Sequence, residues 1–297
     1  MIIDLEDHLQ RKALVLKIHE DVDEFCKREF DEDARTHLGA SIIGNDCKAY
    51  AWNVFRWVKF EDFSGRMLRL FNRGHEEERR FVRWLVGAGF TVFETDPETG
   101  KQFRILGVNG HFGGSLDAMV GAPTHYNINE PMVWLGEFKT HNDKSFKSLK
   151  KSGVAMSKPQ HFRQMCSYGR AYNYKYGLYC AVNKNDDDLY FEIVPLDYRQ
   201  ADDLFRKAEY IINSKTQPPK IATTETFFVC KMCDFKGVCH RGDLPTKNCR
   251  SCKFASPIAD AQWYCGFFND IIPVDFIAKG CDNWHPIIND GSNKLNG

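Results

Sequence analysis

The sequence predicts an α/β fold followed by a cysteine-rich metal-binding C-terminal region. A strong helical pattern precedes several segments with period-two alternation, and further helical and strand patterns follow. The 297 residues are 43% hydrophobic and 13% aromatic, so they can supply a packed core. Seven of the eleven cysteines lie from Cys230 onward, where few apolar periodic segments occur. Bound metal would supply the stability that this region lacks.

The helices and strands are expected in a defined order. Residues 5–38 are charged and helical in pattern, and 46–60 form an aromatic amphipathic segment. A stronger helix runs from about Gly65 to Val86 and ends at the glycines that follow. Strands separated by Gly, Pro and Asn turns are expected at 90–94, 101–108, 111–121 and 131–140. The remaining elements are a helix at 158–176, strands at 177–183 and 189–195, and a helix at 197–213.

The formal net charge is zero, so a nucleic-acid site must be a local basic patch. One patch lies between Lys139 and Lys158, where Gly153 favours a loop, and Lys144 and Lys147 within it are candidate DNA contacts. An ordinary solvated loop is the alternative. The sequence shows no apolar run of about 18 residues and no secretory signal. This predicts a protein of the cytoplasm, in a bacterium or a phage-infected host, with no membrane partner.

Two acids and a lysine stand out among the expected strands. Glu137 and Lys139 share one face of the strand at 131–140, while Phe138 points to the other face. A hairpin can place Asp117, from the preceding strand, beside Glu137. Two converging carboxylates are the hard oxygen ligands that Mg²⁺ or Mn²⁺ prefers. Lys139 can then hold a water or neutralise charge on a phosphate. A surface salt bridge between Glu137 and Lys139 is the simpler alternative.

Asp117 and the triplet Glu137-Phe138-Lys139 resemble the signature of the PD-(D/E)XK nuclease superfamily. Two flanking matches resemble its RecB-type branch. His75 lies on the helix before the strands, as does a metal-binding histidine of that branch, and Gln164 and Tyr168 form its Gln-x-x-x-Tyr pattern. Taken singly, a hydrogen-bonded surface histidine and an ordinary polar helix face are the alternatives. The resemblance covers roughly residues 43–240.

The resemblance implies a restriction-endonuclease-like core, in which a central mixed sheet is flanked by helices. It implies that His75, Asp117, Glu137 and the Phe138 carbonyl bind one or two Mg²⁺ or Mn²⁺ ions and that Lys139 assists the water. Gln164 and Tyr168 would position DNA. The function implied is a phage-type exonuclease that hydrolyses phosphodiester bonds in DNA recombination, repair or degradation.

The first cysteine set is Cys230, Cys233 and Cys239, which needs a fourth ligand. Its spacing suits either zinc or an iron-sulfur cluster. Iron-sulfur members of the RecB-type branch, including AddB and the CRISPR-associated adaptation nucleases, take one cysteine from before the core and three from after it. By that resemblance Cys47 joins the set around a 4Fe-4S cluster that ties the tail to the core. A zinc site that uses His240 is the alternative.

The second cysteine set has the spacing of a structural Zn²⁺ site and consists of Cys249, Cys252, Cys265 and Cys281. His285 is the alternative to Cys281 as fourth ligand. The other cysteines, Cys26, Cys166 and Cys180, are expected to be buried and unreactive.

Four regions are expected: an N-terminal helical region at 1–60, the nuclease core at 61–213, an iron-sulfur segment at 214–242 and a zinc module at 243–297. No GxxxxGK[ST] loop occurs, so a helicase or recombination motor would be a separate partner. Two other functions stay open. A non-catalytic zinc or iron-sulfur protein that binds nucleic acid leaves Asp117, Glu137 and Lys139 without a role, and an iron-sulfur redox protein lacks a flavin or nicotinamide fingerprint.

Overall fold

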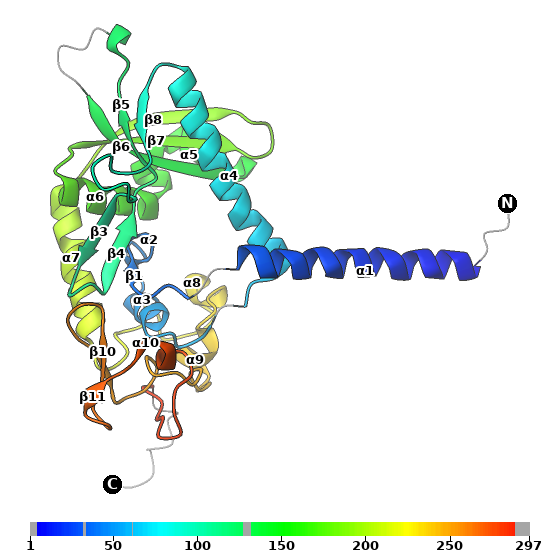
Figure 1. Cartoon of the computed structure of the whole chain (residues 1–297), viewed down its shortest axis with the longest axis vertical. Helices are drawn as coiled ribbons and strands as arrows, with labels where there is room; N and C mark the ends of the chain where they lie inside the picture. The colour runs from blue at the N-terminus through cyan, green and yellow to red at the C-terminus, as the bar shows by residue number, and fades with distance from the viewer. Residues whose placement is uncertain (1–4, 32–33, 61, 127–131, 289–297) are drawn as a thin grey trace.

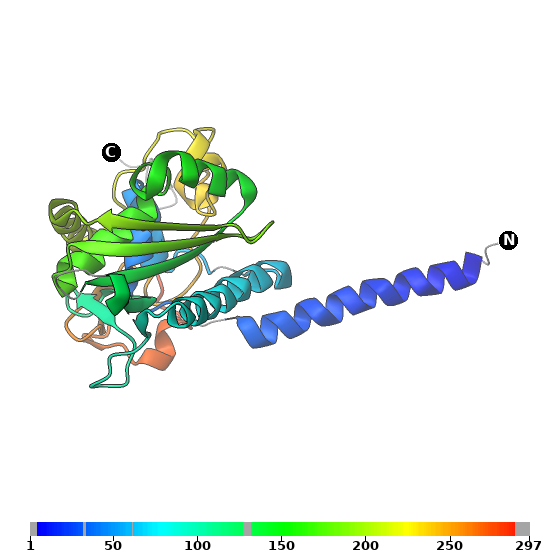
Figure 2. The same ribbon diagram turned by 90° about the horizontal axis from the view of Figure 1, so that it is seen from above.

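The structure is a computed structural model that describes residues 5–31, 34–60, 62–126 and 132–288. Residues 1–4 of the expected N-terminal region and 289–297 of the expected zinc module lie outside the described residues. A long helix α1 (Leu5–Phe30) extends away from the body, and its C-terminal end packs on α4 (Gly65–Gly87) (Figures 1 and 2). A Cβ atom at Gly65 would lie 2.6 Å from the Asp23 Cα, so glycine is needed where the two helices cross.

The predicted sheet is present and is mixed. It contains β2 (Thr91–Phe93), β5 (Ala118–Gly121), β6 (Val133–His141), β7 (Tyr176–Asn183) and β8 (Leu189–Pro195), in the order β2-β5-β6-β7-β8. Strand β6 is parallel to β7, with Glu137 opposite Tyr179, and the other pairs are antiparallel. A parallel pair requires a crossover, which α5 (Asp143–Ser157) and α6 (Pro159–Tyr172) provide.

Helices cover both faces of this sheet (Figure 2). Helix α4 packs Phe81 and Leu85 against Phe138 on one face. Helix α5 packs Phe146 against Tyr179 on the opposite face, which is the face of Glu137 and Lys139. The α/β class, the helix from Gly65 and the separation of Phe138 from its charged neighbours are therefore confirmed. Among the described residues, no helix combines the length and the apolar composition that crossing a membrane requires.

The expected single strand at 111–121 is wrong. It is divided at Leu116 and Asp117 into β4 (Phe112–Ser115) and β5, which belong to different sheets. The smaller sheet has the order β1-β4-β3, with β1 at Leu38–Gly39 and β3 at Arg104–Gly107. Pairing of β5 with β6 starts at Ala118, opposite Gly136. The next donor on β6, the Phe138 N–H, bonds the Asp117 carboxylate instead of a main-chain carbonyl, which ends the ladder there.

The expectation of a basic loop before residue 158 is also wrong, because residues 143–157 form helix α5. Asn142 caps this helix by accepting a hydrogen bond from the Ser145 N–H, and Phe146, Leu149 and Val154 are buried beneath it. Gly153 has a φ of 69°, outside the helical range, so it produces a kink rather than a loop.

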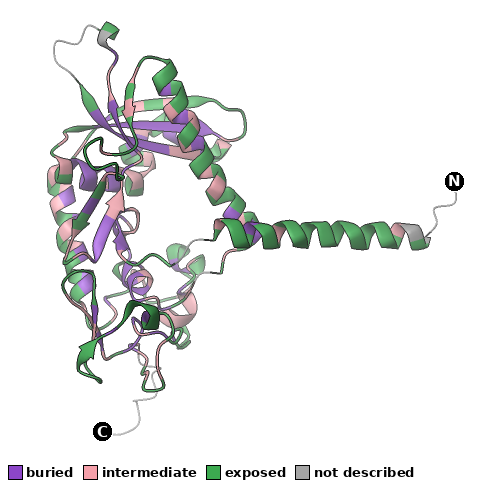
Figure 3. Ribbon diagram, viewed as in Figure 1, coloured by how far each residue is buried: buried purple, intermediate pink, exposed green. Residues whose placement is uncertain are grey.

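The cysteine-rich region is built from short elements that follow helix α7 (Tyr198–Asn213). These elements are α8 (Phe228–Lys231), α9 (Lys236–His240), β9 (Ala255–Pro257), β10 (Trp263–Cys265), β11 (Asp270–Ile271) and α10 (Val274–Ile277). They share one hydrophobic core with the N-terminal helices α2 (Ala40–Ile43) and α3 (Lys48–Phe55). Figure 3 shows buried residues running between the two segments. The C-terminal region therefore does not bury a core of its own.

Candidate active site

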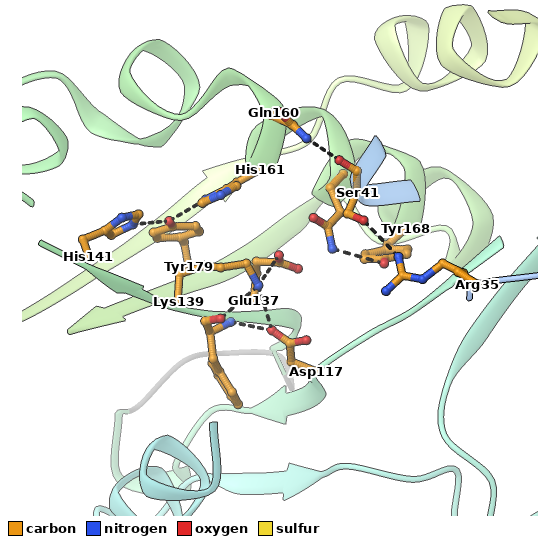
Figure 4. Close-up of polar contacts among 12 residues, drawn as sticks. Arg35, Ser41, Asp117, Glu137, Lys139, His141, Gln160, His161, Tyr168 and Tyr179 are labelled. Carbon is orange, nitrogen blue, oxygen red and sulfur yellow. Dashed lines mark hydrogen bonds and ion pairs between the residues drawn. The ribbon is translucent and has the colours of Figure 1, made fainter. Parts of the chain in front are cut away.

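Three oxygens converge on the ammonium group of Lys139 (Figure 4). The Lys139 Nζ lies 2.6 Å from Glu137 Oε1 and 3.4 Å from Asp117 Oδ2, and it donates a hydrogen bond of 2.9 Å to the Phe138 carbonyl oxygen. These are the oxygens that the sequence predicted as metal ligands. They surround a single cationic group, and oxygen is the donor type that hard divalent ions prefer.

The division of the strand at residue 117 brings Asp117 to this point. Asp117 Oδ2 accepts a hydrogen bond of 2.7 Å from the Phe138 N–H, which fixes its carboxylate against β6. The sequence predicted that Asp117 would meet Glu137, but through an unbroken hairpin strand. The outcome is the same because the carboxylate takes over a hydrogen bond of the sheet.

Glu137 is buried and incompletely satisfied. Its side chain is 1% exposed, and apart from the Lys139 ion pair neither carboxylate oxygen has a hydrogen-bond partner among the described residues. Burial raises the pKa of Glu137 to about 7, Lys139 opposes this change, and Asp117 adds to it. Burial acts to lower the pKa of Lys139, yet Asp117 and Glu137 hold it well above its usual value. A buried carboxylate with unused lone pairs fits a metal ligand.

Helix α4 supplies a further acid, Glu78, beside the predicted site. Glu78 lines the same cavity as Lys139. Burial raises the pKa of Glu78, and the negative charge of Asp117 raises it further. Glu77 is buried but bound by Arg80 at 2.8 Å. The signal for Glu78 was its spacing, because it lies three residues before the buried Phe81 and four after Gly74.

His75, the predicted metal ligand on α4, is exposed and lies near Glu78. It does not line the cavity described below, to which Gly74, Glu77 and Glu78 contribute. Its role in metal binding stays a prediction.

A cavity of about 350 Å³ opens beside Lys139. One wall comes from α4 and carries Glu77 and Glu78. The other is formed by β6, α5 and α6, with side chains that include Lys139, His141, Ser145, Lys158 and His161. Acids therefore face nitrogen donors across a space large enough for a nucleotide-sized group.

Gln164 and Tyr168 lie one above the other on α6, as predicted. The Gln164 amide donates to the Tyr168 hydroxyl at 3.2 Å, and both side chains are buried. Burial raises the pKa of Tyr168, and the charge of nearby Glu137 contributes to this rise. Gln164 and Tyr168 therefore lie near Glu137, where they can hold the acidic cluster in position.

Lys144 and Lys147, the predicted DNA contacts, are exposed on α5. Lys147 pairs with Asp143 at 2.7 Å, one helical turn away. Their role in DNA binding stays a prediction.

The first cysteine set is partly assembled. Burial raises the pKa values of Cys233 and Cys239, and the charge of Cys47 contributes to both. Cys47 is the N-cap of α3, and Cys239 Sγ accepts a hydrogen bond of 3.4 Å from Asn53 on the same helix. Asn53 thus contacts a cysteine that lies 186 residues later in the sequence, while the binding of a cluster by this set stays a prediction.

The second cysteine set surrounds a small enclosed space. Cys249, Cys252, Cys265 and Cys281 line a cavity of about 20 Å³, with Trp284 beside them. His285, the alternative ligand, does not line it. Burial raises the pKa of Cys249 to about 11, and the charges of Cys281, Cys252 and Cys265 contribute.

In neither cysteine set do the side chains converge on a common point, as the ligands of a metal ion would. Among the described residues, no group of three or more His, Cys, Asp or Glu side chains is arranged so that it could hold a metal ion. The cluster at Lys139 has two carboxylates and a main-chain carbonyl in its immediate surroundings. The leftover cysteines behave as expected: Cys26, Cys166 and Cys180 are buried, and burial raises the pKa values of the last two.

No family model and no curated protein matches the chain. Distant similarities exist among solved structures. SSO0001 has 15% sequence identity and a TM-score of 0.43, over 75% of this chain and 96% of that chain. LHK-Exo in complex with dAMP has 14% identity and a TM-score of 0.40, over 59% of this chain and 86% of that one.

A second structure of LHK-Exo, an alkaline exonuclease from Laribacter hongkongensis, has 15% identity and a TM-score of 0.36, over 60% of this chain and 87% of that one. These similarities are too distant to assign a family or an activity to the chain.

Proposed function

We propose that the chain is a Mg²⁺- or Mn²⁺-dependent deoxyribonuclease of the PD-(D/E)XK type. The observation that carries the proposal is the convergence of Asp117 Oδ2, Glu137 Oε1 and the Phe138 carbonyl on one cationic group. A surface salt bridge, the simpler account of Glu137 and Lys139, does not fit a Glu137 side chain that is 1% exposed.

Asp117, Glu137 and the Phe138 carbonyl would hold the metal ion. Glu78 supplies a further carboxylate at the same cluster, and His75 is the predicted ligand at its edge. When bound, the ion would polarise the phosphate and lower the pKa of a water molecule. The burial of Glu137 excludes bulk water from this side and strengthens each electrostatic contact.

Lys139 provides a positive charge next to the attacked phosphate. Asp117 and Glu137 hold the pKa of Lys139 well above its usual value, which favours the charged ammonium form. The role of Lys139 is to orient the attacking water and to stabilise the negative charge that develops on phosphate. The pair Gln164 and Tyr168 keeps the acidic cluster in place from behind.

We further propose an exonuclease that acts in recombination, repair or degradation of DNA. The test is incubation of the protein with linear and with covalently closed circular DNA, each with Mg²⁺, Mn²⁺ or chelator. Metal-dependent loss of linear DNA alone supports the proposal, and cutting of the circle changes it to an endonuclease. Lys139→Ala should abolish either activity, whereas the exposed Lys175→Ala serves as control. No cleavage under any condition contradicts the nuclease and favours a non-catalytic nucleic-acid-binding protein.

For the second cysteine set we propose a structural Zn²⁺ ion bound by Cys249, Cys252, Cys265 and Cys281. Support comes from two fully buried arginines, Arg56 and Arg250, that stack on Trp263 at 5.0 and 4.7 Å. Among the described residues no Asp or Glu pairs with either. Zinc with four thiolates carries a net charge of about −2, which balances two guanidinium ions.

For Cys47, Cys230, Cys233 and Cys239 we propose a 4Fe-4S cluster. The approach of Cys47 to Cys233 and Cys239 supports a ligand set that joins the two ends of the chain. Anaerobic purification should yield a protein with about four iron atoms and the visible absorption of such a cluster. If the purified protein instead contains zinc, and Cys239→Ser loses it, the site is the alternative zinc site that uses His240.

A further inference from the structure

A chain of hydrogen bonds that no part of the proposed mechanism uses lines the cavity beside Lys139. Lys158 Nζ donates to Ser145 Oγ at 2.8 Å, and Ser145 Oγ lies 3.1 Å from His141 Nδ1. His141 Nε2 and His161 Nδ1 lie 2.9 and 2.8 Å from the same Tyr179 hydroxyl. Figure 4 shows the two histidines on either side of Tyr179, next to Lys139. We call these side chains the relay: Lys158, Ser145, His141, Tyr179 and His161.

The geometry determines where the protons of the relay lie. The Tyr179 hydroxyl has one hydrogen, so with neutral imidazoles it donates to one histidine and accepts from the other. Ser145 Oγ already accepts from the Lys158 ammonium, and within the described part of the chain the hydrogen-bond partner that can accept the Ser145 hydrogen is His141 Nδ1. His141 must then carry its proton on Nε2 and donate it to Tyr179.

The remaining step fixes His161. Tyr179 donates to His161 Nδ1, because its oxygen already accepts from His141. His161 therefore carries its own proton on Nε2. That nitrogen has no hydrogen-bond partner among the described residues, and His161 lines the cavity. The opposite arrangement would leave the Ser145 hydrogen without a protein acceptor among the residues that the structure describes.

The surroundings keep both imidazoles neutral. Burial lowers the pKa of His141 to about 4 and that of His161 to about 3, and Lys139 and Lys158 contribute to both. Burial also raises the pKa of Tyr179, so its hydroxyl keeps its proton. A neutral histidine with a fixed tautomer presents a directed N–H group without the desolvation cost of a buried charge.

We propose that the relay holds His161 so that its Nε2–H donates to a phosphate oxygen of a DNA strand in the cavity. The Lys158 ammonium, which donates two hydrogen bonds to Ser145, has a third N–H for that oxygen, and Lys139 adds positive charge, while Glu77 and Glu78 of α4 form the other wall. At neutral pH a phosphodiester group accepts hydrogen bonds and donates none, so it matches a wall of N–H groups. The choice of DNA as ligand rests on the proposed function, but the phosphate site does not.

The first test reads the tautomer and the ligand directly. Long-range ¹H–¹⁵N NMR of the full chain, with chelator present, should show His161 protonated at Nε2 alone. Addition of inorganic phosphate should then shift the His161 Nε2 resonance and leave that of His19, on the exposed helix α1, unchanged. A proton on Nδ1 of His161, or no response to phosphate, would overturn the proposal.

Variants separate a phosphate contact from a merely structural role. His161→Leu should raise the Kd for phosphate and the KM for linear DNA about 10- to 100-fold, the value of a hydrogen bond to a charged group, with a smaller change in kcat. His161→Gln, whose amide N–H replaces Nε2–H, should restore most of the affinity. Tyr179→Phe breaks the relay and should weaken phosphate binding about tenfold.

The control is Tyr172→Phe, which also removes a hydroxyl hydrogen bond, to the Arg104 carbonyl at 3.0 Å, but outside the relay. If His161→Leu and Tyr179→Phe lower the melting temperature and leave the phosphate Kd unchanged, the relay only joins α6 to β7 and the proposal fails. If the protein cleaves DNA but the His161 resonance does not respond to phosphate, only the present inference is refuted. A chain that binds phosphate through His161 and cleaves no DNA refutes the nuclease alone.

Discussion

Phe81 of α4 stacks on Phe138 of β6, with ring centroids 5.4 Å apart and an angle of 28° between the ring planes. Both side chains are buried. Phe138 lies between the acid and the lysine of the site, and Phe81 lies one turn after Glu78. The ring pair therefore sets the distance between the acid of α4 and the acids of the sheet.

We expect Phe81→Ala to lower the free energy of unfolding by about 3–5 kcal/mol, because it leaves a cavity under the sheet. It should also reduce metal-dependent activity through the displacement of Glu78. Phe191, which meets the Phe81 ring edge at 6.3 Å but is half exposed, is the matched control, and Phe191→Ala should cost less than about 1.5 kcal/mol. Urea unfolding measures both. Equal losses would contradict the assignment of Phe81 to the core of the site.

A second prediction concerns the acids on α4. Glu78→Gln should weaken Mg²⁺ binding and reduce activity at least tenfold, because Glu78 shares the cluster of Asp117 and Lys139. Glu76→Gln, an exposed neighbour paired with Arg79, is the control and should have little effect. Calorimetric titration with Mg²⁺ compares them with His75→Ala. A loss in His75→Ala alone would return the role to His75.

The relay predicts how stability depends on pH. The pKa of His141 is about 4 in the folded chain and near 6.5 when exposed, so the unfolded chain binds the extra proton. The contribution of His141 to stability is therefore largest above about pH 6.5 and is lost as the pH drops towards 4, by about 3 kcal/mol, whereas Glu137, whose pKa is raised to about 7, changes stability in the opposite direction over this range. His161 acts in the same direction as His141.

Two other histidines, His37 and His111, also have lowered pKa values and add to this slope. Chemical unfolding at several pH values gives the slope of the unfolding free energy against pH. The contribution of the relay is the difference between this slope in the wild type and in His141→Asn. His19→Gln, on the exposed part of α1, should leave the slope unchanged. If the slope is the same in His141→Asn, the imidazole of His141 in the wild type takes up its proton as readily in the folded chain as in the unfolded chain, which contradicts the prediction.

Gly114 should tolerate no side chain. A Cβ atom there would lie 2.7 Å from the Tyr168 hydroxyl oxygen and 2.9 Å from the Ala40 Cβ. We expect Gly114→Ala to cost about 1–3 kcal/mol of stability and to lower activity by moving Tyr168. In the double variant with Tyr168→Phe, part of the stability should return because the closest atom is gone. Additive losses would show that Tyr168 does not oppose the new methyl group.

The two buried arginines predict a dependence on zinc. Removal of zinc should lower the melting temperature strongly, since it leaves Arg56 and Arg250 without the compensating charge. Arg250→Met should reduce this dependence, and Cys252→Ser should abolish stoichiometric zinc, both measured by elemental analysis and thermal unfolding. The exposed Arg199→Met is the control. A zinc-free chain with unchanged stability would contradict the proposed site.

Local patterns predicted the elements that carry the candidate site. The helix from Gly65 and the strand of Glu137 have clear periods, and the structure confirms both. Asp117 was also identified, although the strand around it is divided. Sequence period could not show the division, because it arises from a hydrogen bond between Asp117 and Phe138, which are 21 residues apart.

Other features depend on tertiary contacts that no local pattern encodes. The segment around Gly153 resembled a loop, yet burial of Phe146 and Leu149 holds it as a helix. The relay joins His141, His161 and Tyr179 from three separate elements, so it becomes visible only when α6 packs on the sheet. The approach of Cys47 to the late cysteines followed from family resemblance and not from spacing.

The core shared by the two ends of the chain has a consequence for synthesis on the ribosome. Trp52 and Phe55 are made early, but Trp263 and Ile277, which belong to the same core, are made about two hundred residues later. At ordinary elongation rates of about 5–20 residues per second, the early aromatic surface waits on the order of tens of seconds for its partners. During that interval the nascent chain exposes a hydrophobic surface. The yield of folded protein in cells should therefore depend on chaperones that bind nascent polypeptides.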